Sequence, residues 1–183
     1  MDKLLTWIIA IFMAAGGLYF IFQKPAVVHD DNINTNPAQI NSFKECVAAG
    51  NPVMESYPRQ CAANGKNFTE NIGNEMALAN LIKIDSPRPN AKLSSPLTVT
   101  GQARGTWYFE ASFPVILVDA DNNELGRGVA QAQSDWMTEE FVPFKATLEF
   151  KTPATATGML LLKKDNPSGL PENDNQLTVP VQF

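Results

Sequence analysis

The chain is poor in the residues that most catalytic and metal chemistry requires. It has one histidine, His29, and two cysteines, Cys46 and Cys61, among 183 residues. A serine or cysteine nucleophile needs a positioned base beside it, most often histidine, and a structural zinc site needs about four ligands. We therefore expect no catalytic residue, no resident metal and no cofactor.

Basic residues are also few and scattered. Fourteen Lys and Arg residues face 19 Asp and Glu residues, which gives a formal net charge of −5. Proteins that bind nucleic acids gather Lys and Arg on one face to neutralise phosphates. The sequence shows no such stripe, so we expect no nucleic-acid partner.

Only one long apolar run occurs, at residues 4–22 (LLTWIIAIFMAAGGLYFIF), and it contains no charge. At a helical rise of ~1.5 Å per residue it would cover ~28 Å, close to the ~30 Å hydrocarbon core of a bilayer. Trp7 and Tyr19 lie towards its ends, as interfacial aromatic residues do. The run predicts a single transmembrane anchor over residues 1–22. A signal peptide cleaved near residues 14–16 is the alternative, and both alternatives export the rest of the chain.

Residues 23–41 are polar, include His29, and are expected to form a flexible linker. Residues 42–72 follow as a small two-cysteine unit. The Cys46–Cys61 spacing is too wide for a C-x-x-C redox pair, and a zinc site lacks two further ligands. We therefore expect a structural disulfide, which is typical of exported proteins. Residues 73–80 would then form a linker with a short helical turn.

Residues 57–68 within this unit resemble part of a Kazal-type protease inhibitor. Four of the six cysteines of such a module are missing, so an inhibitory loop would not be held rigid. The Asn64-Gly65 pair more simply indicates a hairpin turn.

From residue 81 to residue 183, apolar and polar residues alternate with a period of two, which is typical of strands with one buried face. The pattern predicts seven short strands, at residues 81–85, 97–103, 113–118, 125–132, 145–150, 159–162 and 177–183. Segments 113–118 and 159–162 are apolar on both faces, which suits central strands. The small residues of 125–132 indicate a bend at a sheet edge, and Pro180 indicates an edge strand.

Seven short strands separated by turn signals predict an all-β domain, an antiparallel β-sandwich of immunoglobulin type. Because no disulfide is available inside this domain, buried aromatic side chains must stabilise it. Those expected in the core are Trp107, Phe109, Phe113, Phe141, Phe144, Phe150 and Phe183.

Five motifs in this domain carry a more specific resemblance. In order they are IDSPRP at 84–89, SPLTVTG at 95–101, WYFEASFPV at 107–115, DWM with FVPF at 135–144, and KDNPSGLPEND at 164–174. Together they resemble the immunoglobulin-like domain family of bacterial spore germination. The resemblance implies an extracytoplasmic β-sandwich with a binding role, and it covers neither the apolar run nor the two-cysteine unit.

The candidate binding residues lie in the predicted loops. Asp165, Glu172 and Asp174 belong to the longest loop, and loops at the ends of sandwiches commonly carry function. Trp136 lies in a polar segment, where an exposed indole suits sugar rings or peptides. A plug beneath a loop is the alternative for this tryptophan.

Two acidic features have simpler interpretations. Residues 119–124 (DADNNE) suit either a calcium loop or a hairpin turn, and they lack the central glycine and final acid of an EF-hand. Glu110, beside three aromatic residues, is expected to be hydrogen-bonded near the core edge.

The sequence thus predicts a membrane protein with its C-terminal domain outside the membrane, which binds an envelope protein or cell-wall polymer without catalysis. Two alternatives stay open. One is an envelope hydrolase acting on glycan or peptide, with Glu110, Asp165 and Glu172 as its candidate acids. The other is an inhibitor-like or structural stalk built on residues 42–72.

Overall fold

A computed structural model describes residues 39–183, which form one compact unit. The predicted anchor at residues 1–22 and almost all of the predicted linker lie outside the described residues. Within residues 39–183, no helix is long and apolar enough to span a bilayer.

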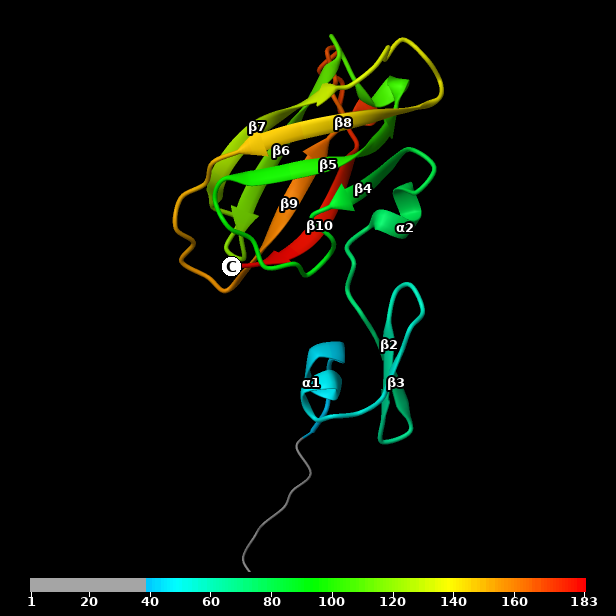
Figure 1. Ribbon diagram of the computed structural model, residues 1–183, viewed down its shortest axis with the longest axis vertical. Helices are drawn as coiled ribbons and strands as arrows, with labels where there is room; N and C mark the ends of the chain where they lie inside the picture. The colour runs from blue at the N-terminus through cyan, green and yellow to red at the C-terminus, as the bar shows by residue number, and fades with distance from the viewer. Residues whose placement is uncertain (1–38) are drawn as a thin grey trace, which may run out of the picture. The chain divides into compact units, whose positions relative to one another are not determined.

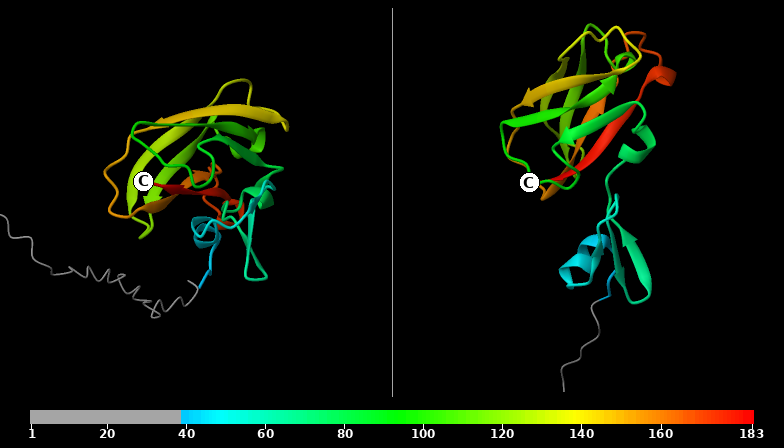
Figure 2. Two further views of the ribbon diagram at one scale, coloured as in Figure 1. Left: turned by 60° about the horizontal axis from the view of Figure 1, so that its bottom comes forward. Right: turned by 45° about the vertical axis from the view of Figure 1, so that its right-hand side comes forward.

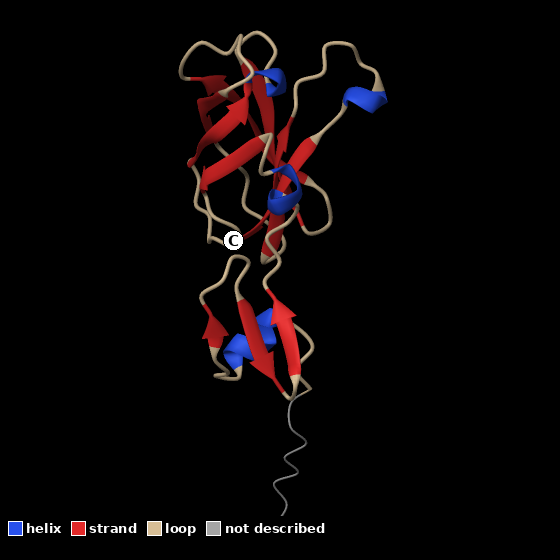
Figure 3. Ribbon diagram, turned by 90° about the vertical axis from the view of Figure 1, so that its right-hand side faces the viewer, coloured by secondary structure: helices blue, strands red, loops and turns tan. Residues whose placement is uncertain are grey.

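The two-cysteine unit consists of one helix and a three-stranded sheet (Figure 3). Helix α1 (Phe43–Ala48) starts at Ser42, whose hydroxyl accepts a hydrogen bond from the Glu45 amide and so caps the helix. Strands β1 (Val53–Met54), β2 (Gln60–Ala63) and β3 (Lys66–Thr69) pair in that order. Asn64 and Gly65 have φ of 52° and 73°, which confirms the predicted hairpin turn.

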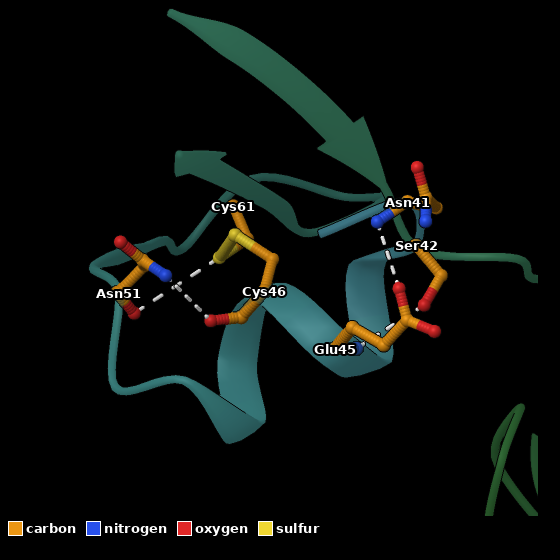
Figure 4. Close-up of a disulfide and its surroundings, with 6 residues drawn as sticks. All are labelled: Asn41, Ser42, Glu45, Cys46, Asn51 and Cys61. Atoms are coloured by element: carbon orange, nitrogen blue, oxygen red, sulfur yellow. Dashed lines mark hydrogen bonds between the residues drawn. A yellow bond between two sulfur atoms is a disulfide. The ribbon is translucent and has the colours of Figure 1, made fainter. Parts of the chain in front are cut away.

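The predicted disulfide between Cys46 and Cys61 is present and joins α1 to β2 (Figure 4). Both cysteines are completely buried and form a small core with Ala63. The partly buried residues around this core are Ile40, Phe43, Val53 and Phe68. So small an apolar core makes the covalent link a major source of this unit's stability.

After a short helix, α2 (Glu75–Leu78), the chain enters a seven-stranded antiparallel sheet. All seven predicted strands occur: β4 (Ile82–Ser86), β5 (Leu97–Arg104), β6 (Ser112–Asp119), β7 (Glu124–Ala132), β8 (Phe141–Leu148), β9 (Thr157–Lys163) and β10 (Gln176–Gln182). Their spatial order is β10-β9-β6-β7-β8-β5-β4. The two halves, β4-β5-β8 and β10-β9-β6-β7, curl around one core (Figures 1 and 2).

The halves of this β-domain are joined into a near-barrel rather than left as two separate sheets. On one side β7 and β8 share only two residue pairs, Gln131 with Lys145 and Ala132 with Phe144. On the other side, residues 90–93 run parallel to β10 and form a bridge between Lys92 and Gln182. The edge of β10, predicted from its proline, is therefore covered by the chain itself.

Aromatic side chains occupy the centre of this core. Phe113 contacts both Phe144 and Tyr108 edge to face, with ring centroids 5.0 and 5.2 Å apart. The prediction for Phe109 was wrong, because this residue is 41% exposed. The buried ring is the neighbouring Tyr108, whose hydroxyl donates a 2.7 Å hydrogen bond to the Val142 carbonyl.

The predicted edge position of residues 125–132 was also wrong. Strand β7 is an interior strand of the sheet, between β6 and β8. Its small residues serve close approach instead, since a Cβ on Gly126 would lie 2.3 Å from the Glu149 carbonyl oxygen. The prediction that residues 113–118 form a central strand is confirmed. Strand β6 lies between β9 and β7 in the sheet and is buried from Val115 to Asp119.

Candidate functional site

Three loops meet at one end of the β-domain, and we call them together the loop end: residues 105–111, 133–140 and 164–175 (upper part of Figure 1). Backbone contacts join them. The Gly105 amide donates to the Glu140 carbonyl at 3.3 Å, and the Asp165 amide donates to the Trp107 carbonyl at 3.0 Å. The first loop therefore holds the other two in place.

All four predicted binding residues belong to the loop end. Asp165 is half-buried, whereas Glu172 and Asp174 are exposed in the longest loop. That loop is ordered by the Asn166 side-chain amide, which donates to Asp174 Oδ1 at 2.8 Å. Trp136 is partly buried and packs against the main core, as the alternative interpretation of this residue described.

The loop end concentrates the negative charge of the protein. Its three loops carry seven carboxylates and one lysine, a formal charge of −6, whereas the whole chain carries −5. The rest of the chain is therefore close to neutral. Among the residues that the structure describes, only one of these carboxylates forms an ion pair, Glu140 with Arg104 at 3.7 Å. The seven are Glu110, Asp135, Glu139, Glu140, Asp165, Glu172 and Asp174.

Each of the three loops also exposes one large apolar side chain. Met137 is 77% exposed, Leu170 51% and Phe109 41%. Apolar groups beside polar ones on a surface commonly mark interaction sites. Sequence reasoning missed Met137 and Leu170, although each stands out as an apolar residue within a polar turn.

A small pocket of about 180 Å³ lies between the first and third loops, lined by Trp107, Lys164, Glu172 and Asp174 among others. The Trp107 indole is 2% exposed. Its Nε1 is the one buried side-chain polar atom within residues 39–183 that has no hydrogen-bond partner. An unpaired buried donor is unfavourable, so an acceptor at this position would stabilise the loop end.

Glu110 does not occupy the core-edge position expected from its sequence. It is exposed at the tip of a tight turn, with φ of 49°, and the following Ala111 has φ of 63°. Phe109 and Ser112 close this turn through two mutual 3.0 Å backbone hydrogen bonds. The two-residue turn aims the side chain into water instead of against the aromatic residues.

Residues 119–124 form a hairpin turn. The Asp119 carboxylate accepts hydrogen bonds from the Asn123 side chain and from the amides of Asn123 and Asp121, at 2.8–3.0 Å. These bonds, the Asn123 side chain foremost, lower the pKa of Asp119 below its usual value. The carboxylate is thus occupied by its own turn. Over residues 39–183, no group of three or more His, Cys, Asp and Glu side chains could hold a metal ion.

A larger groove, of about 730 Å³, is bounded by α1, by the end of β3 and by two residues of the β-domain, Asn90 and Gln182. Arg59 forms a two-pronged ion pair with Glu70 on its wall, with N–O distances of 2.8 and 2.6 Å. This pairing lowers the pKa of the Glu70 carboxyl, which also accepts a 3.2 Å hydrogen bond from the Asn90 amide. The wall is therefore ordered and electrically neutral.

The predicted inhibitor-like segment is also fixed by side-chain contacts. The Tyr57 hydroxyl hydrogen-bonds to the Glu75 carboxylate and accepts from Arg88 at 2.6 Å. Loss of water contact, with the nearby Glu75 charge, raises the pKa of Tyr57 to about 12. Tyr57 is thus engaged within the chain and does not form part of a free loop.

Comparison with known families agrees with the resemblance seen in the motifs. No curated protein and no solved structure was found to match the chain. Residues 81–169 match the family described as the immunoglobulin-like domain of bacterial spore germination, which covers β4 to β9 and leaves out β10 and residues 39–80. This match, together with the curled seven-stranded sheet, supports an immunoglobulin-like domain of the kind that serves as a non-catalytic binding or structural module.

Proposed function

We propose that this protein is a membrane-anchored module of the bacterial cell envelope whose loop end binds a basic segment of another envelope protein. The observation that carries the proposal is the composition of the loop end. The three interconnected loops carry three exposed apolar side chains and six carboxylates that form no ion pair within residues 39–183.

The charge of the loop end favours a partner of opposite sign. At physiological ionic strength the Debye length is about 8 Å, so exposed carboxylates attract a basic partner mainly once it is close to the loop end. Lys or Arg residues of a partner would relieve their mutual repulsion and speed association. Burial of Met137, Leu170 and Phe109 would then supply the desolvated centre that most protein interfaces need.

The proposed location rests on the apolar run at residues 4–22 and on the disulfide. A bridge between Cys46 and Cys61 persists outside the reducing cytosol. Both features support our proposal that the C-terminal domain lies on the outer side of the membrane.

We propose no catalysis for this domain. The acids of the loop end are mostly exposed, and the single histidine, His29, belongs to the predicted linker. General acid–base or nucleophilic chemistry needs a second positioned group within hydrogen-bond reach of the first. Within the described residues, the Asp174 carboxylate accepts a hydrogen bond from Asn166 of its own loop, a contact that orders the loop.

The experiment is affinity capture from detergent-solubilised native envelope with the purified full-length chain, followed by titration of the captured protein. The double variant Glu139→Lys with Glu172→Lys reverses two exposed charges that form no ion pair within the described part. The matched control, Asp85→Lys with Glu149→Lys, makes the same change outside the loop end.

We expect a saturable protein partner whose affinity falls at least tenfold in the loop-end variant, falls with added salt, and stays unchanged in the control. Equal loss in both variants, capture that survives the loop-end reversal, or no saturable protein partner would each overturn the proposal. Hydrolytic turnover of envelope glycan or peptide by the purified chain would overturn the non-catalytic assignment.

A further inference from the structure

The geometry points to a second binding site, distinct from the loop end: we propose that the groove beside α1 binds a glycan strand of acetamido sugars that bear carboxyl groups. This is the chemistry of a bacterial wall glycan that carries no stem peptides. The inference goes beyond the proposed function, because it involves other residues and another class of ligand.

The size of the groove suits a short stretch of such a strand. Its volume of about 730 Å³ lies within the range of roughly 300–1,000 Å³ that is usual for ligand sites. It is an open groove formed by a helix face and a strand end, which a polymer can enter along its length. The lining residues central to the argument are Phe43, Lys44, Asn67, Phe68 and Gln182.

Several polar side chains in the groove are free to bind a ligand. Within the described part of the chain, the side chains of Lys44, Asn67 and Gln182 form no hydrogen bond or ion pair, although each lines the groove. Amide side chains offer both donors and acceptors, which match the hydroxyl and acetamido groups of sugars. By contrast, the Glu70 carboxylate is already bonded, since it accepts hydrogen bonds from Arg59 and from the Asn90 side chain.

Aromatic and aliphatic side chains also line the groove. Phe43 and Phe68 are half-buried, and their covered faces pack on the disulfide core. Arg59 lies over the Phe43 ring at 5.4 Å from its centroid. Phe68, with Val47 and Ala48, lines the groove and suits the C–H faces of sugar rings.

The charge of the groove selects among polymers. Arg59 neutralises Glu70, so Lys44 is the one groove residue whose charge is unpaired as far as the described residues 39–183 are concerned. A densely charged phosphate polymer would need several cations to neutralise it. A basic peptide would be repelled by Lys44, whereas a peptide-free glycan can set the carboxylate of one of its alternate sugars against this single ammonium group. The groove and the acidic loop end therefore favour different ligands.

The groove is also held in shape without a ligand, which lowers the entropy cost of binding. The disulfide fixes α1 against β2, and the Ser42 hydroxyl caps the start of the helix (Figure 4). The Asn41 amide donates to the Glu45 carboxylate at 2.7 Å and orders the approach to α1. On the other wall, Asn90 donates to the Asn71 carbonyl at 2.9 Å.

The test is calorimetric titration of the purified full-length chain with a peptide-free tetrasaccharide of alternating N-acetylglucosamine and N-acetylmuramic acid. Two further probes separate the contributions: a tetramer of N-acetylglucosamine, which lacks the carboxyl groups, and the isolated wall stem peptide. The variant Lys44→Ala with Asn67→Ala removes two exposed side chains that form no hydrogen bond or ion pair within the described residues, and Lys66→Ala is the matched control on the same strand as Asn67.

We expect the double variant to bind the tetrasaccharide at least about tenfold more weakly, since it loses two polar contacts, while Lys66→Ala binds as the unaltered chain does. The carboxyl-free tetramer should bind more weakly than the mixed tetrasaccharide to the unaltered chain. Absence of binding at millimolar glycan, equal affinity in the double variant, or preference for the stem peptide would each overturn the inference. None of these outcomes bears on the loop-end partner, so the two proposals fail separately.

Discussion

Removal of the disulfide should loosen the two-cysteine unit while the β-domain stays folded. Cys46 and Cys61 are 15 residues apart, and closing a loop of this length stabilises a fold by about 3 kcal/mol in the chain-entropy model. Apart from the cysteines themselves, only Ala63 and Ile72 are buried apolar residues of this unit, so little else can offset that loss. The β-domain holds its own, much larger core and contains no cysteine.

Hydrogen exchange followed by mass spectrometry measures the effect. In the variant Cys46→Ala with Cys61→Ala, the free energy of opening β2 and β3 should fall by about 3 kcal/mol, which lowers amide protection by about two orders of magnitude. Amides of β5 and β8, which pair over eight residues, provide the internal control. Unchanged protection of β2 and β3 would refute the reasoning, and so would an equal loss in β5 and β8.

Three further predictions concern single residues. Tyr108→Phe removes the hydrogen bond to the buried Val142 carbonyl and should destabilise the fold by about 1 kcal/mol in denaturant unfolding. Gly101→Ala would place a Cβ 2.2 Å from a carbonyl oxygen of β4, so we expect a loss of about 1–3 kcal/mol and a lower melting temperature. Glu70 has a lowered pKa when folded, so its pairing with Arg59 adds stability above about pH 4.5 that is lost as pH falls through the lowered pKa. In Glu70→Gln that part of the acid-induced loss should be absent, and an identical pH profile would contradict the assignment.

The strands were predictable because their signal is local. Alternation along a few residues defines the buried face of a strand such as β5, whose burial alternates from Leu97 to Arg104. The placement of β7 was not predictable in this way. Its small residues are explained by the backbone of residues 149–150 lying against Gly126, a contact between segments more than 20 residues apart. A small-residue pattern has the same appearance at an edge and at a close crossing.

The candidate site was predictable only in part, for a related reason. Asp165, Glu172 and Asp174 lie in one loop and so stood out along the sequence, but Glu110, Asp135 and Glu139 join them only because the fold brings three loops together. The groove could not be predicted from the sequence, since two of its lining residues, Asn67 and Gln182, are more than 100 residues apart. The predicted anchor lies outside the described residues and stays a prediction.

The opposite chemistry of the two surfaces leads to one further test, of whether they serve a single ligand or two. If one extended partner occupied both, changes at either surface would weaken the binding of that same ligand, and effects at well-separated sites would add. If the ligands are independent, a change at one surface leaves the affinity for the other surface's ligand unchanged. The charge reversals at Glu139 and Glu172 should then leave glycan affinity unchanged, and the changes at Lys44 and Asn67 should leave partner capture unchanged. Loss of glycan affinity in the loop-end variant, or loss of partner capture in the groove variant, would show that the acidic loops and the groove belong to one interface.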